Sequence, residues 1–170
     1  MNDVEFVDSL INTHKDNYKM IIEMWTASRA RVVWSVGLAG FALLNAKPYW
    51  DSLAEKPIVG ISNVWLSLPW IFSTFLGVIT YFLVDETAKT GQLFYASLFN
   101  AFEVFKIDLE DEKANVDKLK QINRGEDQSV SESKKGMLIW SKWARWFELF
   151  TFASLVAGFI WSAIGPLLLK

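Results

Sequence analysis

Few side chains in this sequence could do acid–base, nucleophilic or metal chemistry. The chain has one histidine, His14, and no cysteine. Thiol catalysis, disulfides and thiolate metal sites are therefore excluded, and most histidine-based acid–base and metal designs are too. No Gly-rich phosphate loop, H-E-x-x-H or G-x-S-x-G motif occurs. We expect no enzyme, no catalytic, cofactor-binding or metal-binding residue, and no cofactor.

Carboxylates form the densest polar cluster, at Asp108, Glu110, Asp111 and Glu112. Successive residues of a helix diverge by about 100° around its axis, so only some of these side chains could share a cation. A solvated helix face is the main interpretation and a divalent-cation site is the alternative. His14 carries a similar pair of interpretations: a packed, hydrogen-bonded residue, or a protonation switch between subunits.

A second group of charges lies at the ends of apolar stretches. Asp85, Glu86 and Glu148 follow or precede such stretches, and Arg31 and Arg145 lie at matching positions. The charges could extend individually to a membrane surface. They could also pair with one another and hold a closed state.

Three uncharged stretches are the elements that position these groups. Hydrophobic residues make up 52% of the 170 residues and the mean hydropathy is positive, which is typical of a membrane protein. A helix needs about 20 apolar residues to cross a bilayer. We predict spans at 32–50, 63–84 and 148–168, the first being the shortest uncharged stretch.

The distribution of Lys and Arg predicts the orientation, because these residues favour the cytoplasmic side. They are frequent in the N-terminal segment 1–31 and between the second and third spans, and rare in the loop 51–62 and after the third span. We expect a bacterial inner (cytoplasmic) membrane protein with its N-terminus in the cytoplasm and its C-terminus outside. The net charge of −2 gives no reason to expect a nucleic-acid partner.

The tryptophan run "WSKWARWFE" lies where the third span should enter the membrane. Its residues could form a core stripe, a stacking platform for nucleic acid or a ring at the membrane edge. Indole rings and cations both favour the headgroup layer, which supports the membrane edge and makes the bilayer itself a partner. The predicted interface residues are Trp140, Trp143, Trp146, Lys142 and Arg145, with Trp50 and Trp65 on the far side.

Long amphipathic helices should extend from the first two spans into the cytoplasm. A seam of apolar residues with alternating spacings of three and four runs through 1–31, and a second apolar stripe runs through 85–123. The predicted seam residues are Val4, Val7, Ile11, His14, Tyr18, Ile21, Trp25, Leu98, Phe102, Phe105 and Leu109. Seams of one period suggest that these helices pack on each other or on other copies.

The remaining segments are a linker and an interfacial helix. Residues 124–136, "RGEDQSVSESKKG", are polar and bracketed by glycines, which predicts a flexible linker. Residues 137–147 should form a helix at the membrane surface. The expected fold is thus an all-α membrane protein with three transmembrane helices, the first two extending into the cytoplasm as long amphipathic helices.

Small residues repeat every four positions within the spans. Such stripes let helices approach closely, inside one subunit or between subunits, and they are also tolerated beside water in a pore. The residues concerned are Ser35 and Ala39, Ser73 and Gly77, and Ser154, Gly158 and Ser162. No charge lies deep in a span, which argues against an ion-coupled carrier.

The layout resembles the SLATT group of small bacterial membrane effectors. The resemblance rests on "MWTASRARVVWSVGLAGFALL" leading into a span, a short loop, a second span, and the Phe-rich "GQLFYASLFNAFEVFKIDLE" returning into the cytoplasm. It implies an anti-phage, pore-forming effector with a nucleotide-signal partner. The third span departs from the two-span pattern of that group, and no site residue is carried over.

The sequence therefore favours a small, self-associating inner-membrane protein that perturbs the membrane when triggered through its cytoplasmic helices. Two alternatives stay open. One is a non-catalytic anchor or adaptor subunit, whose seams bind a different cytoplasmic protein. The other is a holin-like lysis protein, although so long a cytoplasmic region exceeds what that role needs.

Overall fold

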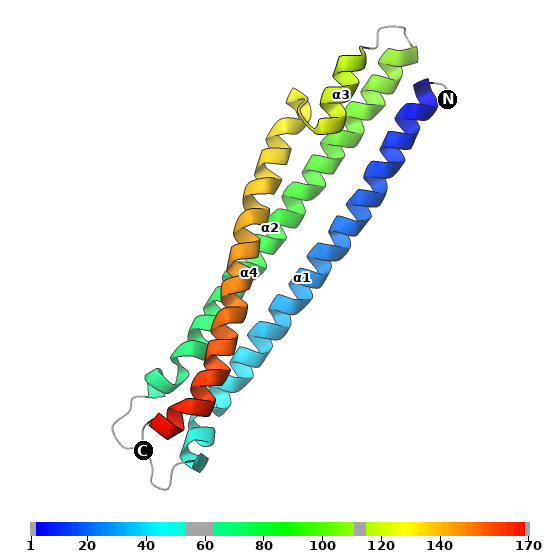
Figure 1. Ribbon diagram of the computed structural model, residues 1–170. Coiled ribbons are helices and arrows are strands. Elements are labelled where there is room, and N and C mark those ends of the chain that lie inside the picture. Colours follow the sequence, from blue (N-terminus) through cyan, green and yellow to red (C-terminus); the bar gives the residue numbers. More distant parts are fainter. Residues whose placement is uncertain (1–2, 54–62, 111–114, 169–170) are drawn as a thin grey trace. The chain divides into compact units, whose positions relative to one another are not determined.

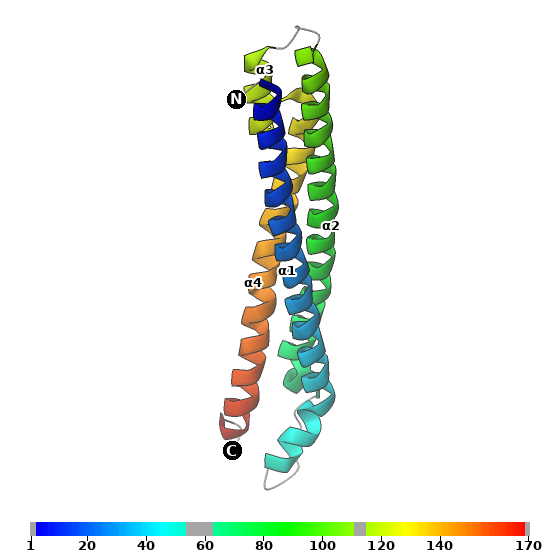
Figure 2. The same cartoon turned by 90° about the vertical axis from the view of Figure 1, so that its right-hand side faces the viewer.

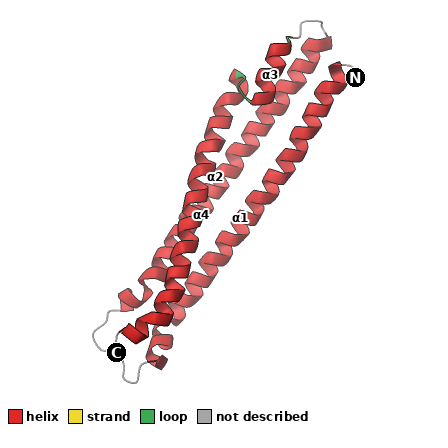
Figure 3. Cartoon of the chain, viewed as in Figure 1, coloured by secondary structure: helices red, strands yellow, loops and turns green. Residues whose placement is uncertain are grey.

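The computed structural model describes residues 3–53, 63–110 and 115–168, and every regular element in these ranges is a helix (Figures 1 and 3). In chain order the helices are α1 (Asp3–Leu53), α2 (Asn63–Glu110), α3 (Val116–Arg124) and α4 (Gln128–Leu168). By length and composition, α1, α2 and α4 can each cross a membrane. The predicted all-helical class with three helices of spanning length is thus confirmed.

The two long helices continue through the predicted membrane boundaries. α1 runs unbroken from Asp3 past Val32, and α2 runs unbroken from Asn63 past Asp85. Neither boundary carries a helix-breaking proline, so the backbone hydrogen bonds continue. Asp3 and Glu5 lie in the first turn of α1, where negative charge stabilises the positive end of the helix dipole.

The chain divides into two compact units. The first unit comprises residues 1–27 and 84–142, and the second unit comprises residues 28–83 and 143–170. Helices α1, α2 and α4 each contribute to both units, and each unit has its own packed core.

The core of the first unit joins all four helices (Figure 2). Val7 and Ile11 of α1 pack with residues of α2, and Ile122 of α3 and Val130 of α4 complete the cluster. The buried α2 members are Phe94, Tyr95, Leu98, Phe102 and Phe105. The two predicted seams therefore pack on each other within one chain, because their apolar periods match along the helices.

The sequence predicted that the second amphipathic helix would continue to residue 123, and this prediction was wrong. α2 ends at Glu110 and α3 begins at Val116, with Asn115 as its N-cap. The Asn115 side chain accepts a hydrogen bond of 2.8 Å from the Asp117 amide, which satisfies a donor that the helix start leaves open. The separate helix lets Ile122 enter the core, where it is fully buried.

The predicted linker 124–136 is mostly helical, and this prediction was wrong beyond its first residues. Gly125 closes α3 in the left-handed conformation (φ 63°), and α4 begins at Gln128. Two bonds, from Gly125 N to Ile122 O and from Glu126 N to Gln121 O (both 2.8 Å), form a Schellman motif. Tertiary packing overrides the polar composition, since Val130 is fully buried.

The second unit packs α1, α2 and α4 together around Ala39, Trp70 and Leu155. Ala42 and Leu43 pack against this cluster from α1. No separate interfacial helix exists at 137–147, because α4 runs through it without a break. Of the predicted external loop, 51–53 belong to α1 and 54–62 lie outside the described residues.

Candidate functional site

Three polar side chains form an ionic cluster between α1 and α4 in the second unit. The Ser28 hydroxyl donates to Glu148 Oε2 at 2.9 Å, and Arg31 Nε donates to Glu148 Oε1 at 2.9 Å. The Glu148 side chain is 17% exposed, against 55% for Arg31. Both carboxylate oxygens are therefore occupied, and because the arginine and the carboxylate are charged, the bond between them is stronger than one between neutral groups. Of the two arrangements considered for the charges at the span ends, individual extension to the membrane surface or pairing, Arg31 and Glu148 adopt pairing.

The other charges near the predicted span ends behave differently. Asp85 and Glu86 pair with Lys89 of the same helix, at 2.9 and 2.8 Å. The hydrogen bonds that Lys89 donates, to Glu86 and then to Asp85, raise the pKa of Lys89 above its ordinary value. Arg145 is exposed and has no ion pair within the described residues.

A row of hydroxyls, the hydroxyl seam, joins α2 to α4 and consists of Ser73, Thr80 and Thr151. All three are fully buried. Thr80 Oγ1 and Thr151 Oγ1 are 2.9 Å apart, and Ser73 Oγ donates to Thr151 O at 3.4 Å. Each threonine hydroxyl also lies within hydrogen-bond distance of a carbonyl one turn earlier on its own helix. Because each hydroxyl has one proton, one threonine donates to the other, and the accepting threonine donates to its own carbonyl. Hydroxyls that satisfy each other in this way hold neighbouring helices together in an apolar environment.

Two of the predicted small residues, Gly77 and Gly158, lie at helix contacts of the second unit. A Cβ added at Gly77 would lie 2.3 Å from Val36 Cγ2, and one at Gly158 would lie 2.8 Å from ring atoms of Trp70. Ser35 and Ala39 are buried, whereas Ser154 and Ser162 are partly exposed. Ser35 Oγ donates to Arg31 O. The glycines thus permit close packing inside one chain.

An apolar groove, the α2/α4 groove, lies on the outside of the second unit. Its volume is about 620 Å³. Its walls are Pro69, Phe72 and Leu76 of α2 and Phe147, Phe150, Ala153, Ser154 and Ala157 of α4. Small residues on the α4 wall leave room that larger side chains would fill.

The tryptophan run projects from α4 with all three rings exposed. Trp143 contacts Phe147 (centroids 6.4 Å apart) and Trp146 stacks near Phe150 (6.1 Å). Lys142 is also exposed. The side chains of Trp50 and Trp65 lie outside the described residues.

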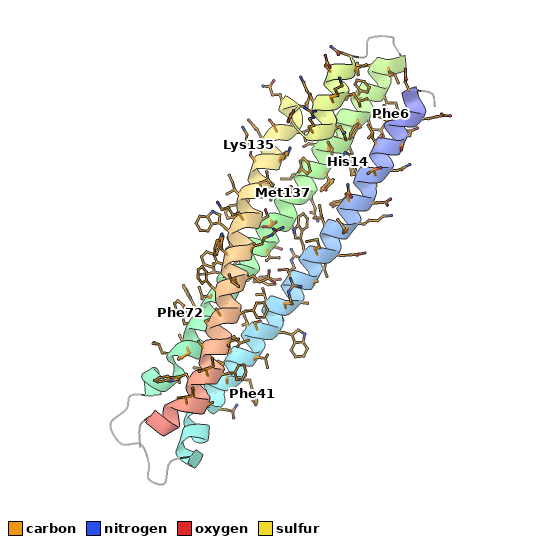
Figure 4. All side chains as sticks on the ribbon, viewed as in Figure 1. Phe6, His14, Phe41, Phe72, Lys135 and Met137 are labelled. Atoms are coloured by element: carbon orange, nitrogen blue, oxygen red, sulfur yellow. The ribbon has the colours of Figure 1, made fainter. Side chains whose placement is uncertain are left out.

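The first unit contains the predicted seam residues and His14 (Figure 4). His14 Nε2 is 2.9 Å from Asn123 Oδ1 on α3, and its ring lies 5.5 Å from that of Phe102. Val4 and Trp25 are partly buried, and Tyr18, Ile21 and Leu109 pack against the core. Tyr18 lies against Tyr95, with ring centroids 4.8 Å apart.

The acidic cluster is not gathered into a metal site within the described residues. Asp108 binds Lys118 of α3 at 2.9 Å, while Asp111 and Glu112 lie outside the described residues. Nowhere in residues 3–53, 63–110 and 115–168 do three acidic or histidine side chains come together to hold a metal ion.

A second groove, of about 370 Å³, lies between α2 and α3 of the first unit. Ser97, Asn100 and Lys118 provide polar groups, and Ile122 and Val104 provide an apolar floor. Lys106 of α2 pairs with Asp8 of α1 at 2.9 Å elsewhere in the unit.

Sequence reasoning missed Ser28, Thr80, Thr151 and Trp70. Thr80 and Thr151 were detectable as hydroxyls one or two turns from the small residues, and Ser28 lies one turn before Arg31. No pattern in the sequence singled out Trp70. In the structure its ring is buried opposite Gly158, and its Nε1 has no hydrogen-bond partner in the described part of the chain.

No protein-family model, curated protein or solved structure matches the chain. The arrangement by itself supplies helix packing, an ion pair with a mostly buried carboxylate, and two grooves.

Proposed function

We propose that this chain is a self-associating integral membrane protein of the bacterial inner membrane that perturbs the bilayer when its copies rearrange. In this proposal the first unit is cytoplasmic and receives the trigger, and the second unit spans the membrane. This is the kind of effector, of the anti-phage type, that the SLATT resemblance implies.

One observation carries the self-association. Outside the predicted spans, α1 exposes Phe6, Met20 and Met24. These residues share one helix face, because Met20 lies about four turns after Phe6 and Met24 about one turn after Met20. α2 likewise exposes Leu93 and Ile107. A water-facing unit seldom leaves such stripes uncovered, and a second copy or partner would cover them.

The hydroxyl seam supports the membrane-perturbing part of the proposal. Three helices cannot enclose an aqueous path alone, so any path must lie between copies. If α4 parts from α2, Ser73, Thr80 and Thr151 offer hydroxyls to water at the interior of the span. The ionic cluster of Ser28, Arg31 and Glu148 keeps α4 on α1 in the closed arrangement.

Native mass spectrometry of the protein in lipid nanodiscs tests the self-association. We expect a closed homo-oligomer of four or more copies, which Met20→Glu breaks up because it places charge in the apolar stripe. Asn17→Glu, on the same exposed side of α1, is the matched control. Oligomers should also release a small dye from liposomes. A monomer in every lipid composition would refute the proposal.

A second candidate is a membrane-anchored adaptor. The groove beside Asn100 and Lys118 combines polar groups with an apolar floor, as protein and peptide sites do. A fixed ratio with a second protein, abolished by Val104→Glu in this groove, would favour this candidate.

A further inference from the structure

We propose that the α2/α4 groove binds one acyl chain of an anionic phospholipid, whose headgroup is held by Lys142 and the indoles of Trp143 and Trp146. This inference goes beyond the proposed self-association and rests only on the proposed placement of the second unit in the membrane.

The groove suits an apolar chain rather than a polar ligand. Seven of its eight wall residues are apolar. The eighth, Ser154, donates its hydroxyl proton to Thr151 O at 2.9 Å. Its wall side chains therefore offer no unused proton to a peptide or another polar occupant, which would lose hydrogen bonds to water on entering.

The length of the groove matches one leaflet of a bilayer. On α4 its wall extends from Phe147 to Ala157, which is ten residues or about 15 Å along the helix. The hydrocarbon core of a bilayer is about 30 Å thick, so one leaflet takes about half of that. Glu148, bonded to Arg31, follows Phe147 directly, so charged groups begin where the groove ends.

Two indoles continue the groove at this end. The Trp143 ring lies 6.4 Å from that of Phe147, and the Trp146 ring lies 6.1 Å from that of Phe150, between centroids. Both phenylalanines are groove walls. At 3.6 residues per turn, both indoles point within about 45° of the mean direction of the α4 wall. They are therefore placed to contact the glycerol and headgroup of a lipid whose chain lies in the groove.

The cation beside these indoles is Lys142. It is exposed, and it lies one turn before Trp146 in the same unbroken helix. It points about 80° away from the α4 wall, against about 140° for Arg145. Lys142 makes no ion pair or hydrogen bond within residues 3–53, 63–110 and 115–168. Its flexible stem lets the ammonium group reach a phosphate at the end of the groove.

A lipid supplies the missing negative charge, whereas a second copy of the chain does not. The carboxylates at the predicted span ends are already paired, Glu148 with Arg31 and both Asp85 and Glu86 with Lys89. A second copy in the same orientation therefore brings no unpaired carboxylate from these positions to Lys142. An anionic phospholipid brings the charge and the apolar chain in one molecule.

Native mass spectrometry from nanodiscs containing equal amounts of phosphatidylglycerol and phosphatidylcholine tests the site. We expect one phosphatidylglycerol per chain to remain after the bulk lipid is stripped. Ala157→Trp should remove it by filling the groove, whereas Val156→Trp should not, because Val156 is exposed on α4 outside the groove.

A second pair of variants tests the headgroup. Lys142→Gln should keep a bound lipid but lower the preference for phosphatidylglycerol about five-fold, the contribution of one cation near an anionic surface. Arg145→Gln removes the same charge one turn away on another side of α4 and should change the preference little. Both changes are at exposed side chains, so the protein should stay folded and the site remains testable where Ala157→Trp does not fold.

Equal loss of preference in Lys142→Gln and Arg145→Gln would overturn the proposal, because it would show general attraction to surface charge. So would a wild type that keeps no lipid, or a folded Ala157→Trp that keeps it. The same spectra count copies. Oligomers without bound lipid would leave self-association standing, and monomers that hold phosphatidylglycerol would refute self-association while supporting the lipid site.

Discussion

A single missing side chain sets the distance between α2 and α4, because Trp70 occupies the space beside Gly158. We expect Gly158→Ala to lower the free energy of unfolding by about 1–3 kcal/mol, since the added methyl would overlap the Trp70 ring at 2.8 Å. Gly40→Ala is the control, as nothing lies within 4 Å of its added Cβ. It should be neutral or stabilise by roughly 0.5–1 kcal/mol. Denaturation in mixed micelles measures both, and equal effects would contradict the packing.

The Arg31–Glu148 pair is the residue-scale interaction that the proposed closed arrangement depends on. A double-mutant cycle with Arg31→Gln and Glu148→Gln should give a coupling energy near 1 kcal/mol, because Glu148 is mostly buried. The exposed pair Asp117–Lys120 should give only about 0.3 kcal/mol. Similar coupling in the two cycles would mean that burial does not strengthen the Arg31–Glu148 bond.

Burial of Tyr95 makes the first unit sensitive to alkali. Burial raises the pKa of the Tyr95 phenol above its ordinary value near 10. Above about pH 10 the unfolded chain loses this proton while the folded chain keeps it, so stability present below that pH is lost as pH rises. Tyr95→Phe should flatten the fall in the unfolding free energy between about pH 9 and 11. An unchanged slope would exclude Tyr95 as its source.

At the scale of elements, Ile122 is the buried residue through which α3 enters the core of the first unit. The Ile122 side chain is fully buried, whereas that of Val116 in the same helix is 66% exposed to solvent. Ile122→Ala should cost about 2–5 kcal/mol, and Val116→Ala should cost little. Amide hydrogen exchange should then speed up in α3 first. Unchanged protection of α3 in Ile122→Ala would show that Lys118–Asp108 and the caps hold it instead.

The elements that the sequence predicts well are those with a strong local signal. The uncharged stretches and the seam from Val7 to Tyr18 have a clear helical period, and α1 and α2 follow it. The break before α3 and the start of α4 at Gln128 were missed because they depend on distant contacts. Val130 is one apolar residue in a polar stretch, so only the core it enters turns that stretch into helix.

The candidate site shows the same limit. The glycine positions were predictable from their spacing, but their partners Val36 and Trp70 were not, since helix rotation decides which neighbour faces each glycine. The charges at Arg31 and Glu148 were predictable as a depth-matched set, whereas the choice of partner required the packing of α1 on α4.

At the scale of the whole molecule, an exposed apolar side chain faces either lipid or water, and chemical labelling distinguishes the two environments. Met24 of the first unit and Phe75 of the second are comparably exposed, at 53% and 61%. If Phe75 faces lipid and Met24 faces the cytoplasm, a membrane-impermeant maleimide should label Met24→Cys from the cytoplasmic side and should leave Phe75→Cys unlabelled from either side.

The same measurement tests the orientation predicted from Lys and Arg. Glu55→Cys, in the predicted external loop, should react only from the opposite side to Met24→Cys. Labelling of both from one side would mean that the first two helices do not cross the membrane as a pair. Rapid labelling of Phe75→Cys would mean that the second unit faces water. The described residues of each copy supply three helices of spanning length, too few to enclose water, so that water would have to lie between copies or the unit would have to lie outside the bilayer. Detergent-solubilised protein in which both sites react equally distinguishes the two.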